Sequence, residues 1–185
     1  MKTLALLIFT LTPWFVSAWN EPSYAGQEVH SIKSLSEEEI ESLRRGDGMG
    51  FAKLAELNHF PGPRHVLDLS EELDLSPQQL ADTQALFDEM QHKAIDLGVR
   101  IVEAEAQLDR AFEQGSIRPN WLETTLREIG RLQAELRYVH LRAHLSQTQL
   151  LSTEQIREYD ALRGYSQAPD DHGKHQHPLP GNSSQ

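Results

Sequence analysis

The chain has 185 residues and a formal net charge of −11, with 28 acidic residues against 17 basic ones. This length fits one domain with extensions. The acidic balance argues against a nucleic-acid-binding protein, which needs a basic surface to neutralise phosphates. Because there is no cysteine, disulfides, thiol nucleophiles and cysteine-ligated zinc are excluded. A metal site would have to use the 9 histidines and the carboxylates.

The first 18 residues have the pattern of a secretory signal peptide. Lys2 provides a positive charge, an apolar run extends from Leu4 to Val16, and Val16-Ser17-Ala18 resembles a cleavage site. The run is shorter than the ~20 residues that cross a bilayer as a helix. We therefore expect an exported protein cleaved after Ala18, with an uncleaved anchor as the alternative.

Beyond this segment the sequence predicts helices separated by short breaks. Ser36, Ser76 and Ser152 each begin a capping box, with Glu or Gln three residues later. The expected helices run from Ser36 to about Gly46, over 51–57, over 64–73, over 77–114, from Pro119 onward, and from Ser152 to about Gly164. The glycine-rich residues 46–50 are interpreted as a flexible hinge.

The two longest expected helices carry apolar heptads. In the first, one row runs from Leu80 to Leu108 and a second runs three residues behind it from Thr83 to Ala111. The second helix repeats the pattern from Leu122 to Ala143. Since only a few residues separate these helices, we expect an antiparallel pair. The predicted fold class is all-α: a long antiparallel helical hairpin with short flanking helices.

A second apolar stripe lies off the heptad seam of the first long helix. It consists of Ile95, Val99, Val102 and Ala106. It can pack beneath the short N-terminal helices or form a dimer interface. Because a layer of two long helices is thin, we expect both arrangements together. We therefore expect a homodimer.

The predicted organisation has four parts. They are a signal peptide over 1–18, an N-terminal linker over 19–34, a helical domain over 35–165 and a tail over 166–185. The tail is expected to be disordered because it has no apolar periodicity.

Two of the capping boxes carry a resemblance to a known family. Leu75-Ser76-Pro77-Gln78-Gln79 and Leu151-Ser152-Thr153-Glu154-Gln155 resemble the paired LTxxQ motifs of the periplasmic Spy/CpxP family. Its superfamily includes the zinc-binding ZraP proteins and the CnrX-type nickel and cobalt sensors. Both motifs have serine where the family usually has threonine, and the two residues cap helices similarly.

The resemblance covers roughly residues 47–165. It implies an all-α, bowed hairpin dimer in the periplasm of a Gram-negative bacterium. Members of the family act as ATP-independent chaperones, as stress-signalling inhibitors, or as metal sensors and scavengers.

His140 and His144 are the leading candidates for metal ligands. They lie one turn apart, so both imidazoles project from one helix face and can bind a Zn²⁺, Ni²⁺, Co²⁺ or Cu²⁺ ion. The alternative is a pair of half-exposed polar residues on a solvated face. Their placement resembles the CnrX-type sensors, in which a ligating histidine follows a valine. In those sensors a methionine four residues later also ligates, and His144 stands in its position.

The same resemblance implies ligands from other segments. Histidines before the long helix are matched by His65 and more loosely by His59. A carboxylate from the start of the long helix completes such sites. The candidate groups near that start are Asp82, Asp88, Glu89 and His92. A second cluster, in the tail, consists of His172, His175 and His177. It is either a weakly chelating tract or an inert, solvated one.

The sequence shows no catalytic motif. It lacks a Gly-x-Ser-x-Gly elbow and a His-Glu-x-x-His site, and residues 46–50 lack the spacing of a phosphate-binding loop. We expect a non-enzymatic periplasmic protein for heavy-metal binding, sensing or resistance, since the negative charge suits cations. The alternative is an ATP-independent refolding chaperone or an envelope-stress adaptor. Such a protein would act on unfolded periplasmic proteins or on a membrane sensor partner.

Overall fold

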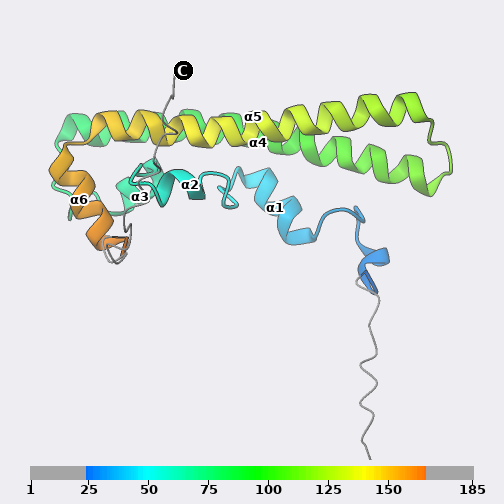
Figure 1. The fold of residues 1–185 in the computed structure, drawn as a ribbon, viewed down its shortest axis with the longest axis horizontal. Coiled ribbons are helices and arrows are strands. Elements are labelled where there is room, and N and C mark those ends of the chain that lie inside the picture. Colours follow the sequence, from blue (N-terminus) through cyan, green and yellow to red (C-terminus); the bar gives the residue numbers. More distant parts are fainter. Residues whose placement is uncertain (1–23, 166–185) are drawn as a thin grey trace, which may run out of the picture.

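A computed structural model describes residues 24–165, which form helices packed around two long ones (Figure 1). The elements are η1 Gln27–Val29, α1 Glu37–Arg45, α2 Lys53–Glu56, α3 Pro63–Asp68, α4 Pro77–Glu113, α5 Pro119–Leu150 and α6 Thr153–Leu162. Among the described residues there is no strand, only an isolated bridge between Ile32 and Leu35. The expected all-α class is confirmed.

The three predicted capping boxes begin α1, α4 and α6. In each, the side chain of Ser36, Ser76 or Ser152 accepts a hydrogen bond from the backbone N–H three residues later. The Glu or Gln at that third position accepts in return from the serine's backbone N–H. At the other end of α1, Gly46 adopts the left-handed conformation (φ 69°) that glycine tolerates without steric cost. Local capping therefore sets these helix boundaries close to where the sequence predicts them.

Helices α4 and α5 lie side by side and run in opposite directions (Figure 1). Gln147 donates to the Thr83 hydroxyl over 3.1 Å. Farther along, Arg100 and Glu128 form an ion pair at 3.6 Å. The core between these contacts is made by the heptad positions Ala94, Leu97, Ile101, Leu132 and Leu136, all of which are buried. The predicted apolar rows therefore face the core over this stretch.

Helix α1 packs against α4, and Gly98 allows the close approach. A Cβ at position 98 would lie 2.0 Å from the carbonyl oxygen of Leu43. This packing buries Val102, and Ile32, from the segment expected to be a linker, joins the same core. Packing beneath the N-terminal helices is therefore observed for Val102, whereas Val99 on the same stripe stays 38% exposed.

The two glutamines of the paired motifs bind one another where α4 and α6 begin. The amide of Gln79 donates to the carbonyl of Leu150 over 2.8 Å, and that of Gln155 donates to the carbonyl of Leu73 over 3.1 Å. The two amides also pair reciprocally, at 2.8 and 3.2 Å. Each glutamine thus caps its own helix and holds the other helix start in place.

No helix within residues 24–165 combines the length and the apolar composition that crossing a membrane requires. The expected signal peptide over 1–18 lies outside the described residues, as does the tail over 166–185 with His172, His175 and His177.

Candidate functional site

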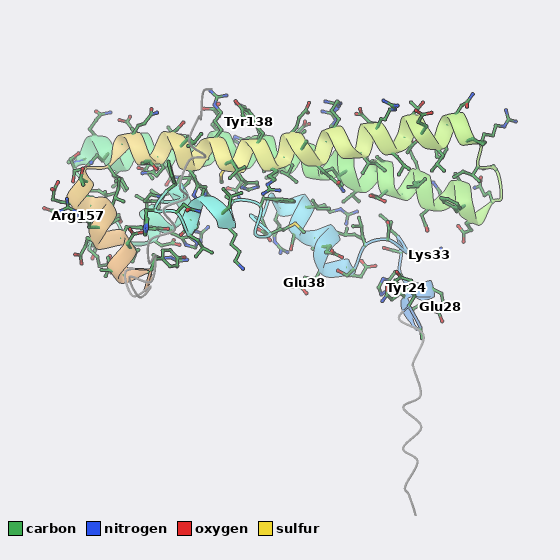
Figure 2. All side chains as sticks on the ribbon, in the orientation of Figure 1. Tyr24, Glu28, Lys33, Glu38, Tyr138 and Arg157 are labelled. Carbon is green, nitrogen blue, oxygen red and sulfur yellow. The ribbon has the colours of Figure 1, made fainter. Side chains whose placement is uncertain are left out.

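A cavity of about 510 Å³ lies between the segment from Gly46 to His65 and the two long helices. Helices α1–α3 run along one face of the α4–α5 pair, and Tyr138 projects from the opposite face (Figure 2). Three histidines line the cavity: His65 comes from α3, and His140 and His144 come from α5. Folding therefore gathers the three histidines that the sequence analysis ranked first.

His140 is buried, with 4% of its surface exposed, and its Nε2 atom has no hydrogen-bond partner in the described part of the chain. The ring of Phe51 stacks on it, with the centroids 5.9 Å apart. Burial lowers the pKa of His140, and the nearby His144 lowers it further. The imidazole is therefore neutral at neutral pH. Burying a polar atom without a hydrogen-bond partner lowers the stability of the fold. A buried histidine nitrogen of this kind therefore needs a physical explanation.

His144 is oriented by a backbone carbonyl. Its Nδ1 atom lies 2.7 Å from the carbonyl oxygen of Phe60, and because a carbonyl only accepts, Nδ1 must carry the proton. In the neutral ring the lone pair is then on Nε2. Metal-binding histidines commonly donate their other ring nitrogen to a carbonyl in this way.

Gly62 makes room for the His144 ring. A Cβ at position 62 would lie 2.7 Å from Cε1 of His144 and 2.9 Å from its Nε2. Any larger residue there must displace the imidazole. Gly62 therefore fixes where the Nε2 atom of His144 can lie.

His65 stands at the cavity wall and is half-buried. Burial lowers its pKa, and the positive charge of Arg163 lowers it further. Its Nδ1 atom lies 3.8 Å from a carboxylate oxygen of Asp68, which is beyond hydrogen-bond distance. The ring is therefore neutral at neutral pH and only loosely held.

Glu56 is a cavity residue that the sequence analysis did not identify. It is buried, and it accepts a hydrogen bond from the hydroxyl of Tyr159. The Arg163 guanidinium is 3.6 Å from one of its oxygens, and Nδ1 of His144 is 3.5 Å from the other. Burial raises the pKa of Tyr159, and the bond to Glu56 raises it further, so the hydroxyl keeps its proton. These contacts fasten α6 to α2 beside His144.

Nothing in the sequence signals this role for Glu56. The residue lies in a four-residue helix, and its partners come from α6, about a hundred positions later. Only the folding of α6 back onto α2 brings these groups together.

The remaining described candidates, His59, Asp82, Asp88, Glu89 and His92, do not line this cavity. Nδ1 of His59 lies 2.7 Å from a carboxylate oxygen of Asp160 instead. Glu89 and His92 are exposed on other faces of α4, where Glu89 pairs with Lys93.

Helix geometry explains why the α4 candidates miss the cavity. Each residue turns a helix by about 100°, so positions 87, 90 and 91 face the cavity while 89 and 92 lie on the far side of α4. Asp82 and Asp88 accept hydrogen bonds from Gln78 and Gln84 on the outer surface of α4. The start of the long helix therefore contributes no carboxylate to the cavity.

Within residues 24–165, no three His, Asp or Glu side chains converge closely enough to hold a metal ion as they stand. The donor chemistry nevertheless fits a transition metal, because the cavity has neutral imidazoles and one of them has an unpartnered nitrogen. A third ligand would have to come from a side chain that turns, and His65 is the loosely held one.

Comparisons of the chain with family models, with curated proteins and with solved structures found no significant match. The resemblance to the Spy/CpxP family therefore stays a prediction that depends on the two motifs.

Proposed function

We propose that this chain is a non-enzymatic, exported heavy-metal-binding protein of the Spy/CpxP superfamily, acting in sensing or resistance in the periplasm. The observation that carries the proposal is the buried Nε2 atom of His140. It has no hydrogen-bond partner among residues 24–165, and it belongs to a cavity shared with His144 and His65. A ligand that accepts its lone pair would remove the cost of leaving this nitrogen unpaired.

The proposed ligands are Nε2 of His140, Nε2 of His144 and the imidazole of His65. Imidazole suits Zn²⁺, Ni²⁺, Co²⁺ and Cu²⁺, and the neutral rings of His140 and His65 lose no proton on binding. His65 would turn toward the other two rings on binding. Phe51 would shield His140 from water on one side.

Assembly is part of the proposal. We propose that α4 and α5 form a helical hairpin of the Spy/CpxP type and that two copies associate. Since α1 covers Val102, the part of the second stripe available to a partner is Val99. Sedimentation of the chain from residue 19 as a monomer at micromolar concentration would contradict the dimer.

Calorimetric titration of the chain from residue 19 with Zn²⁺, Ni²⁺, Co²⁺ and Cu²⁺ tests the metal site. We expect His140→Ala to weaken binding at least tenfold, because it removes a direct ligand. His92→Ala is the matched control, since His92 is an exposed α4 histidine outside the cavity. Joint replacement of His172, His175 and His177 by alanine should leave the affinity within about twofold, because these residues are not among the proposed ligands.

Gly62→Ala sharpens this test without removing any ligand. The added methyl group would contact the imidazole at the end of the His144 side chain. It should therefore move that ring and leave the backbone of the surrounding helices in place. We expect weaker metal binding with nearly unchanged thermal stability. If neither His140→Ala nor Gly62→Ala changes the affinity, the site is wrong. If no metal binds and the protein suppresses aggregation of an unfolded client, the chaperone alternative is favoured.

A further inference from the structure

The cavity contains thioether sulfur as well as imidazole. The chain has 3 methionines, and one of them is the initiating Met1. The other two, Met49 and Met90, both line the cavity with His140. Met49 comes from the loop between α1 and α2, and Met90 comes from α4.

Met49 is not placed as a core-filling residue. It lies between Gly48 and Gly50, and 42% of its surface is exposed. Its φ of 41° is in the left-handed region, which non-glycine residues seldom adopt. An unusual backbone conformation that presents a methionine at a cavity wall is more often found at functional positions than at purely structural ones.

The other donors of the cavity suit a soft ion. Two carboxylates line the cavity, and both are engaged: Asp47 pairs with Arg45 at 2.7 Å, and Glu56 accepts from the Tyr159 hydroxyl near Arg163. Both are therefore poorly placed to act as hard, anionic ligands. What the cavity offers instead is neutral imidazole nitrogen and two thioether sulfurs. Thioether sulfur favours Cu(I) over divalent ions such as Zn²⁺, whereas imidazole accepts both.

We propose that this cavity binds Cu(I), with the sulfurs of Met49 and Met90 and the Nε2 atom of His140 as ligands. The inference rests on the proposed function, because it assumes that His140 ligates a metal. It adds the identity of the ion and two ligands from segments outside α5. Cu(I) is taken up in its reduced state, so no electron transfer is involved.

Competition for Cu(I) under anaerobic conditions tests this assignment. The chain from residue 19 would be titrated against bathocuproine disulfonate as wild type, Met49→Leu, Met90→Leu and the double variant. Leucine keeps a similar volume and removes the sulfur. We expect each single variant to bind Cu(I) at least tenfold more weakly, and the double variant more weakly still. Zn²⁺ affinity, measured on the same proteins, should change by less than about twofold.

Two measurements keep the test independent of folding. X-ray absorption of the Cu(I) complex should show copper–sulfur scattering in the wild type and none in the double variant. Met49→Leu also replaces a partly exposed loop residue and should unfold at the wild-type temperature.

The outcomes separate this inference from the proposed function. If the double variant binds Cu(I) like the wild type while His140→Ala loses both metals, the proposed function stands and the thioether ligation is overturned. Equal losses of Zn²⁺ and Cu(I) in the methionine variants would also overturn it, since the methionines would then act through packing. If His140→Ala affects neither metal, the proposed function fails, and the inference fails with it.

Discussion

The two halves of the long helix pair have the same heptad pattern but differ in what covers them. Where α1–α3 lie on the pair, Ile101 and Leu136 are nearly inaccessible, at 2% and 1%. Toward the loop that joins α4 to α5, the heptad positions Leu108 and Leu122 are only half-buried. The heptad therefore determines which side faces the partner helix, and a third layer of helices determines how deeply that side is buried.

Ion pairs do not compensate for the smaller burial of apolar side chains at the uncovered end. Arg127 pairs with Glu123 at 2.6 Å, and Arg131 pairs with Glu128 at 2.6 Å, all within α5 and partly in solvent. Exposed pairs of this kind contribute little to stability, because water and salt screen their attraction. We infer that the covered half provides most of the stability and that the uncovered half depends on it.

The largest expected effect is on the free energy of unfolding, when one leucine from each half is replaced by alanine. Leu136→Ala should lower the free energy of unfolding by about 2–5 kcal/mol, because it leaves a cavity in a closed core. Leu122→Ala, at the half-buried position of the same heptad row near the loop, should lower it by only about 1 kcal/mol. Chemical denaturation of both variants measures the difference. Losses of similar size would show that the two halves are equally important for stability.

Alanine substitutions at two glycines should have smaller effects on stability, and of opposite sign. Gly98→Ala should destabilise by about 1–3 kcal/mol, because its methyl group would collide with the Leu43 carbonyl and push α1 off α4. Gly130→Ala has open space around it in α5 and should stabilise by about 0.5–1 kcal/mol, since alanine loses less backbone entropy in a helix. The two shifts in melting temperature should have opposite signs. A stabilising Gly98→Ala would contradict the close approach of α1.

The smallest expected effect is a loss of stability as the pH falls below about 6.5. Burial lowers the pKa of His140 and His65 in the folded protein, whereas an unfolded histidine titrates near 6.5. Between the lowered pKa values and about 6.5, the unfolded state binds more protons, so the free energy of unfolding decreases as the pH decreases. Thermal unfolding in EDTA from pH 7.5 to 5.5 should show this decline, less steeply for His140→Gln. A melting temperature that rises over this interval would contradict the burial of His140.

The features that could be predicted from sequence were the local and periodic ones. Ser36, Ser76 and Ser152 mark helix starts because a cap needs only residues three apart. His140 and His144 could be paired for the same reason, since one helical turn brings them to one face. Both signals are complete within a single element.

Features that depend on two distant segments could not be predicted. Glu56 reaches His144 only because α2 lies across α5, and Gly62 matters only because a ring occupies the space beside it. Glu89 and His92 were placed near the site by their distance along α4, but their rotation about the helix axis turns them away from it. Met49 was interpreted only as part of a hinge, because the cavity that it lines is formed together with residues of α2, α3, α4 and α5.

The reciprocal amide pair of Gln79 and Gln155 has a consequence for cooperativity. The two residues are 76 positions apart, and each supplies the other's hydrogen bonds while capping its own helix. If α6 detaches, the amide of Gln79 loses its hydrogen bonds with Gln155, and if the start of α4 frays, Gln155 loses its bonds with Gln79. The two chain segments at this end of the molecule therefore form one unit of local opening, in which neither helix start is released alone.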